Sequence, residues 1–165
     1  MTARLLIFVC LFMASAISAQ EIPTTSDQYE KEYNINIRKS RINGIYIPEN
    51  ISDAIDEIIR LSPAASIEQF KNGEEDLVVR KLHFGLGKWL AVKWNFDGGS
   101  RYSHYLRMMG VTYPDDMISF TLRSLHRHLN GNPMELKERA QAISERRKKE
   151  HEARLNMGTP IDTLK

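Results

Sequence analysis

Cysteine is almost absent from this chain of 165 residues, whose single cysteine, Cys10, lies in an apolar run near the N-terminus. The sequence after this run has no side chain for a disulfide, a thiolate metal site or a cysteine nucleophile. A lipoprotein signal is also excluded, because Phe8 and Val9 stand before Cys10 where such a signal needs a small residue. We therefore expect packing alone to stabilise the fold.

A large charge of either sign is missing as well. Lys and Arg number 23 against 21 Asp and Glu, which leaves a formal net charge of +2. Such a small charge does not indicate a nucleic acid or an acidic membrane as partner, and we predict no nucleic-acid binding. The basic cluster RRKK at residues 146–149 has glutamates on both sides, so a solvated helix is favoured over a membrane or nucleic-acid contact.

The N-terminal apolar run is too short to cross a bilayer of roughly 30 Å as a stable helix. It spans Leu5–Met13, follows Arg4, and precedes the small-residue stretch ASAISA that ends at Ala19. This order is typical of a secretory signal peptide, with cleavage after Ala19 or, alternatively, after Ala16. We predict a signal peptide over residues 1–19, export to a periplasm or beyond, and no stable membrane span after cleavage; an uncleaved anchor is the alternative.

Three segments follow the predicted signal peptide. Residues 20–46 are polar and have no sustained hydrophobic period, which predicts a flexible leader whose later part, around residues 35–47, is extended and docks on the domain. Residues 47–136 are predicted to form the folded domain. Residues 137–165 are predicted to form a charged helix and tail, because the sequence SERRKKEHEAR is almost wholly charged.

The hydrophobic pattern of the folded part is helical throughout. Apolar residues recur at spacings of three and four, most clearly at Ile118, Leu122, Leu125 and Leu129, and no alternating strand pattern is longer than a few residues. The sequence therefore predicts an all-α protein, a single compact bundle of about five or six short helices. Nothing in it indicates the oligomeric state.

Proline, glycine and capping residues divide this bundle into its expected helices. These are helices over about 52–61, over 63–70, from 74 to a glycine-rich interruption and on to about 94, from Ser100 to Gly110, from Pro114 to Asn130, and from Pro133 onward. Gly85 and Gly87 each destabilise a helix interior by roughly 1 kcal/mol relative to alanine. We expect a break or a very close helix crossing at that point.

The candidate site residues are polar and aromatic side chains near the predicted helix ends. They are Trp94, Arg101, Tyr102, Tyr105, Asp115, Asp116 and His126. Trp94, Tyr102 and Tyr105 could form a platform for a sugar or a peptide, whereas core packing is expected for Trp89. Gly98–Arg101 leads into a helix N-terminus, which is either an anion site or a glycine turn with a serine cap.

Asp115 and Asp116 could act as an acid and a base or hold a metal, but adjacent carboxylates in a first turn more often complement the helix dipole. His126 and His128 are two residues apart, so they face different sides of a helix and cannot chelate one ion together. We therefore assign no catalytic residue, no metal and no cofactor.

Four motifs carry a resemblance to a known family. They are HFGLGKW at residues 83–89, GGSR at 98–101, YPDDM at 113–117 and LHRHLNGNP at 125–133. In this order they resemble a family of small bacterial proteins that is defined only as a domain of unknown function. The resemblance covers a little over half of the chain and implies a helical domain, without implying an activity.

Two functions follow as hypotheses. The first is an exported, non-enzymatic module that binds a protein or cell-envelope component through its glycine-rich loops and adjacent aromatic residues. The alternative is a small hydrolase-like or transferase-like enzyme that uses Asp115 or Asp116 as base, His126 as acid and Arg101 as anion clamp. The alternative requires that these groups lie within hydrogen-bond reach of one substrate position.

Overall fold

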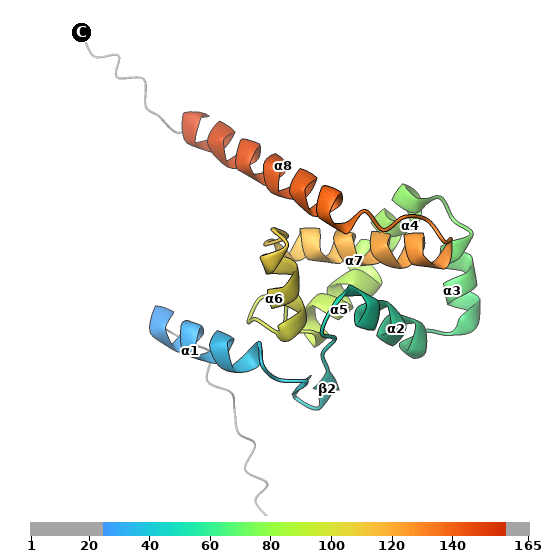
Figure 1. The fold of residues 1–165 in the computed structure, drawn as a ribbon, viewed down its shortest axis with the longest axis horizontal. Coiled ribbons are helices and arrows are strands. Elements are labelled where there is room, and N and C mark those ends of the chain that lie inside the picture. The colour runs from blue at the N-terminus through green and yellow to red at the C-terminus, as the bar shows by residue number, and fades with distance from the viewer. Residues whose placement is uncertain (1–24, 158–165) are drawn as a thin grey trace, which may run out of the picture.

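Helix α7, Pro114–Leu129, lies at the centre of the protein in a computed structural model that describes residues 25–157 (Figure 1). It begins with Pro114 in its first turn, as predicted, because proline lacks the N–H that a first turn leaves unpaired. Its apolar side chains, Ile118, Leu122 and Leu125 among them, are buried. The predicted signal peptide lies outside the described residues.

Short helices surround α7 on several sides. Their bounds are α2 Ile51–Leu61, α3 Ala64–Lys71, α4 Glu75–Leu82, the π-helix η1 His83–Gly87, α5 Lys88–Lys93 and α6 Arg101–Met108. In Figure 1, α2 and α4 lie on opposite sides of α7, and both contact it. The predicted all-α class is confirmed, and each predicted helix of the domain is present within a few residues of its expected bounds.

The glycine-rich segment forms a π-helix rather than a break. Gly87 packs directly on α7, because a Cβ built there would lie 2.2 Å from Cγ2 of Ile118. The close helix crossing expected at Gly85 and Gly87 is therefore confirmed at Gly87. At Gly85, in contrast, a Cβ would meet no atom within 4 Å.

The segment predicted to be a flexible leader contains regular structure. Helix α1, Ser26–Asn36, is followed by a two-stranded antiparallel hairpin, β1 Arg41–Ile42 and β2 Ile45–Tyr46. Asn43 and Gly44 form its turn with positive φ angles of 51° and 78°. An Asn-Gly pair between apolar residues is a strong hairpin signal, and it contradicts the expectation of a flexible segment here.

Helix α1 could not be recognised by its pattern, because none of its residues is buried. Tyrosines hold it against α6 and the loop before α6. The hydroxyl of Tyr29 donates to the carbonyl oxygen of Asp97 at 2.7 Å, and the hydroxyl of Tyr33 lies 2.9 Å from Nδ1 of His104. An amphipathic stripe, the signal that predicted the other helices, is absent from this one.

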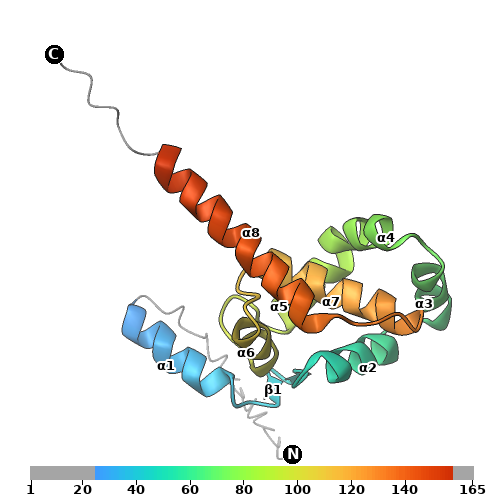
Figure 2. The same cartoon turned by 45° about the horizontal axis from the view of Figure 1, so that its top comes forward.

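Helix α8, Leu136–Met157, projects away from the body of the protein (Figures 1 and 2). Among residues 136–156 of this helix, only Ala140 is fully buried. Arginines of this helix donate side-chain hydrogen bonds to the body of the protein, and Arg139 donates to the carbonyl oxygens of Phe120 and Met134 and to Oγ of Ser124. Burial lowers the pKa of Arg139 to about 10. This value is still well above neutral pH, and the side chain therefore remains charged there.

Candidate functional site

The structure distributes the polar residues predicted from the sequence over separate places. Asp116 and His126 are ten residues apart on the single helix α7, which corresponds to about 15 Å along its axis. Two groups at this distance cannot reach the same substrate atom. The geometry required by the enzyme hypothesis is therefore not present in this structure.

The adjacent residues Asp115 and Asp116 lie in opposite environments. The side chain of Asp115 is 60% exposed and accepts a hydrogen bond from Nζ of Lys88 at 2.7 Å. This ammonium group, with His83 at 3.5 Å, lowers the pKa of Asp115. Asp116 is buried and accepts from Arg146 and Arg147 of α8, each at 2.5 Å. One carboxylate is thus a surface ion pair and the other attaches α8.

Arg101 connects α6 to the hairpin and to α2. Its Nε donates to the carbonyl oxygen of Ile47 at 2.7 Å, and its guanidinium lies 5.2 Å from the ring centroid of Tyr46. Asp53 is 3.9 Å away and accepts from the Tyr46 hydroxyl at 2.8 Å, which raises the pKa of Tyr46. The guanidinium is therefore already engaged by groups of the protein.

His126 supports the turn between α3 and α4. Its Nε2 donates to the carbonyl oxygen of Gly73 at 2.9 Å, and its ring meets Phe70 edge-on at 5.5 Å. Its Nδ1 has no hydrogen-bond partner, and the nearest carboxylate, that of Glu75, is 3.8 Å away. The side chain of His126 thus contacts both Phe70 and Gly73 and holds them in position.

The predicted aromatic platform is not on the surface. Trp94 and Tyr102 are fully buried and meet at 5.3 Å in a T-shaped pair, while Tyr105 stacks on Tyr102 at 6.3 Å. The Tyr102 hydroxyl bonds to Thr121 at 2.8 Å, and burial raises the pKa of Tyr102. The rings of Trp94 and Tyr102 therefore belong to the core.

The expectation for Trp89 is also wrong, because this side chain is 43% exposed. Leu90 and Ala91 are the residues of α5 that face the core. At about 100° per residue, Trp89 lies about 200° around the helix axis from Ala91, so it points outward when Leu90 and Ala91 face the core. The expected roles of the two tryptophans are therefore exchanged: Trp94, expected on a binding platform, is buried, and Trp89, expected in the core, is exposed.

The glycine turn before α6 is closed by its own side chains. Ser100 accepts from the backbone N–H of Ser103, and Ser103 Oγ accepts from the N–H of Ser100 at 2.8 Å. This is the capping-box arrangement. Of the two interpretations of Gly98–Arg101, the turn with a serine cap is the one observed. Among residues 25–157, no group of three His, Cys, Asp or Glu side chains could hold a metal ion.

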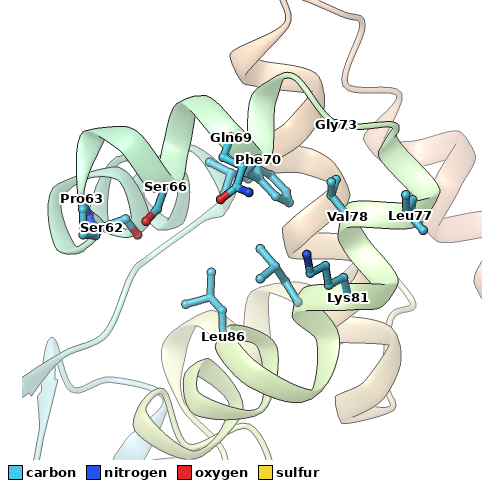
Figure 3. Close-up of a pocket in the computed structure, with 12 residues that line it drawn as sticks. Ser62, Pro63, Ser66, Gln69, Phe70, Gly73, Leu77, Val78, Lys81 and Leu86 are labelled. Atoms are coloured by element: carbon cyan, nitrogen blue, oxygen red, sulfur yellow. The ribbon is translucent and has the colours of Figure 1, made fainter.

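A pocket of about 500 Å³ lies between α3 and α4, away from the predicted site residues apart from His126 (Figure 3). It is lined by Ser62, Pro63, Ser66, Gln69, Phe70, Gly73, Leu77, Val78, Lys81, Leu82, Leu86 and Leu125. Figure 3 shows Leu86 of η1 pointing into the space between the two helices, with Phe70 across from it. Its volume is typical of ligand pockets in proteins.

A second pocket of about 180 Å³ continues the first one toward α5. It is lined by Ile58, Leu61, Ser62, Leu86, Trp89 and Leu90, and it shares Ser62 and Leu86 with the first. We call the two together the apolar groove. Three of its apolar residues are about half exposed: Leu61 at 45%, Leu77 at 58% and Trp89 at 43%.

The groove exists because of how the sequence folds locally. Pro63 ends α2 and starts α3, which turns α3 away from α2. The close packing of Gly87 on α7 positions η1, so that Leu86 lines both parts of the groove. π-helical turns occur frequently at functional sites. Sequence reasoning singled out the glycines and Trp89 but missed Leu77 and Phe70, because the groove forms only when distant helices meet.

Charge in the groove has one sign. Among the described residues that line it, Lys81 is the only one with an ionisable side chain. Lys81 is exposed and has no ion-pair partner within residues 25–157. The other polar side chains that line the groove are the neutral ones of Ser62, Ser66 and Gln69.

The fold and groove define a small all-α domain with an open apolar recess, and no helix of the described part is long and apolar enough to traverse a membrane. The model of a family described as a domain of unknown function, DUF6794, matches residues 47–129, half of the chain. The chain belongs to this family. No curated protein and no solved structure matches it.

All residues that line the apolar groove lie within the matched segment. Helices α1 and α8 lie outside it. The groove therefore lies in the part of this chain that matches the family model, while the N-terminal helix and the projecting C-terminal helix lie outside that part.

Proposed function

We propose that this protein is an exported, helical, non-enzymatic binding module, and that the apolar groove receives an apolar part of a partner protein of the cell envelope. The observation that carries the proposal is the exposure of Leu61, Leu77 and Trp89 around one recess. Contiguous exposed apolar surface beside a pocket is a mark of an interaction site, whereas single exposed apolar residues are ordinary.

The proposed route of export is the predicted signal peptide over residues 1–19, which supports a periplasmic or secreted location. The scarcity of cysteine is compatible with an oxidising compartment, since the part of the chain after the predicted cleavage site has no thiol to be oxidised. The partner is accordingly sought among envelope and exported proteins.

Site-specific photo-crosslinking tests the proposal. Leu77 of the full chain is replaced by p-benzoylphenylalanine in cells that produce the protein, which are then irradiated. Leu77 is 58% exposed at the groove, so the substitution is compatible with folding. We expect a covalent adduct with an envelope protein, formed by a chain that begins at Gln20, where cleavage after Ala19 leaves it.

The matched control is the same replacement of Leu155, which is 62% exposed on α8, far along the chain from the groove. We expect no comparable adduct from this position. Equal labelling from both positions, or none from position 77, would contradict the proposal that the groove is the binding surface.

A further inference from the structure

We infer that the occupant of the apolar groove is an amphipathic α-helix of the partner protein, with an acidic residue placed beside Lys81. The inference rests on the proposed function and names the class of partner. Three observations carry it: the engaged backbone of the groove walls, the length of the groove, and the single sign of its charge.

The walls of the groove offer an incoming chain almost no backbone partner. Helices α3, α4 and α7 satisfy their own backbone groups internally. Even the turn between α3 and α4 is occupied: the carbonyl oxygen of Lys71 accepts from Asn130 at 3.0 Å, and that of Gly73 accepts from His126 at 2.9 Å. A peptide strand would bury unpaired N–H and C=O groups there, at a large cost. A helix satisfies these groups itself.

The length of the groove suits a helix of about three turns. Leu77 marks one end and Trp89 the other, and both belong to the continuous run α4, η1 and α5. They are twelve residues apart, which corresponds to at most about 18 Å, because the π-helix η1 between them rises less per residue than an α-helix. A helix of this length carries anchors at positions i, i+3 or i+4, and i+7 on one face, which is the usual pattern of helix-in-groove binding.

The charge of the groove selects the polar margin of that helix. Lys81 lines the same pocket as Leu77 and Val78 and has no acidic partner among residues 25–157. A carboxylate of the incoming helix would supply the missing partner. Because the ammonium group is exposed, this pair affects which helix binds more than how tightly it binds.

A second copy of this chain is a poorer occupant. Within the described residues α8 is the helix that projects furthest from the body, and Leu155 is its only exposed large apolar side chain (Figures 1 and 2). An acyl chain is a poorer occupant as well, because the groove is open along its length and would leave such a chain in contact with water.

Titration of the purified protein with three synthetic 14-residue peptides tests the inference. The first has leucines at i, i+3, i+4 and i+7 and glutamates on the margin; the second has lysines for the glutamates; the third has a central proline, which breaks the helix. Trp89 reports binding by a blue shift of its emission, because Trp94 is already fully buried. We expect the acidic peptide to bind roughly two- to fivefold more tightly than the basic one, and the proline peptide not to bind.

Two variants assign this binding to the groove. In Leu77→Glu we expect at least about a tenfold loss of affinity, because a charge would have to be buried beneath the peptide, whereas Leu155→Glu leaves the affinity unchanged. In Lys81→Glu we expect the preference to reverse in favour of the basic peptide. Unchanged preference in Lys81→Glu, or equal binding by Leu77→Glu, would overturn the inference.

Other outcomes identify other occupants and also overturn it. A blue shift with dodecanoate but with none of the peptides points to an acyl chain, and a dimer in sedimentation that Leu77→Glu dissociates points to a second copy. If crosslinks form from position 77 while no peptide binds, the inference of a helical occupant is wrong and the proposed binding function stands. If crosslinks and peptide binding both fail, the binding function fails as well.

Discussion

Two glycines two residues apart have different structural roles. In η1, Gly87 lies against the buried side chain of Ile118, and Gly85 faces open space. The sequence marks both as costly inside a helix, but only the contact with α7 shows that a side chain at position 87 would meet Ile118. The close approach at Gly87 also holds η1 in the position from which Leu86 lines the groove.

We predict that Gly87→Ala lowers the free energy of unfolding by about 1–3 kcal/mol, because the added methyl group overlaps Ile118 in a packed core. The matched variant Gly85→Ala should leave this free energy unchanged or raise it by up to about 1 kcal/mol, since alanine restricts the unfolded chain. Urea denaturation of the purified variants measures both values. Equal destabilisation by the two substitutions would contradict the assigned packing.

At the level of single elements, α8 is attached by charge in addition to the apolar contacts of Leu136, Ala140 and Ile143 with the core. Asp116 of α7 receives Arg146 and Arg147, and the guanidinium of Arg147 also lies 4.4 Å from the ring centroid of Tyr113. These arginines are half of the RRKK cluster that the sequence indicated to be solvated. Both contact a buried carboxylate of the protein, although the side chain of Arg146 remains 52% exposed, and Lys148 and Lys149 are exposed as well.

We expect Asp116→Asn to lower the free energy of unfolding by about 1–3 kcal/mol and to speed amide hydrogen exchange in α8, because the charged hydrogen bonds to both arginines weaken. The neighbouring variant Asp115→Asn should change stability by less than about 1 kcal/mol, since this carboxylate pairs with Lys88 at the surface. Hydrogen exchange that is unaltered in α8 of Asp116→Asn would show that other contacts hold this helix.

For the whole molecule, acid is expected to reduce stability in part through Asp115. The Lys88 ammonium lowers the pKa of Asp115 in the folded protein below its ordinary value of 3.8. A carboxyl group with a lowered folded pKa contributes stability above the unfolded value and loses it as the pH falls through the folded one. Since the side chain is mostly exposed, the contribution is a few tenths of a kcal/mol.

Urea midpoints between pH 5 and pH 2.5 measure this loss. We expect Asp115→Asn to flatten the curve slightly relative to the parent. Glu138→Gln is the control, because Glu138 is exposed and has no ion pair within the described residues. A curve for Asp115→Asn that coincides with the parent at 0.05 M salt would exclude the contribution of Asp115.

Much of the fold could be predicted from local signals. Pro114, Ser100 and Gly110 mark helix ends correctly, because capping depends on a few neighbouring residues. Less of the candidate site could be predicted. Trp94 and Tyr102 looked like surface aromatics next to a loop, yet they are buried with Phe96, since the side of a short helix that faces the core depends on partners distant in sequence.

The sequence by itself determined the helical class and the order and ends of the helices of the family domain. It also marked Gly85 and Gly87 as an irregular point in a helix. Each of these features follows from interactions within a few residues. Only the tertiary structure decided that Asp116 and His126 are separate, that Asp116 attaches α8, and that Phe70, Leu77, Leu86 and Trp89 surround one groove. The physical reason is that these features arise where α3, α4, η1 and α8 pack on α7, and packing joins residues whose spacing along the chain carries no trace of the contact.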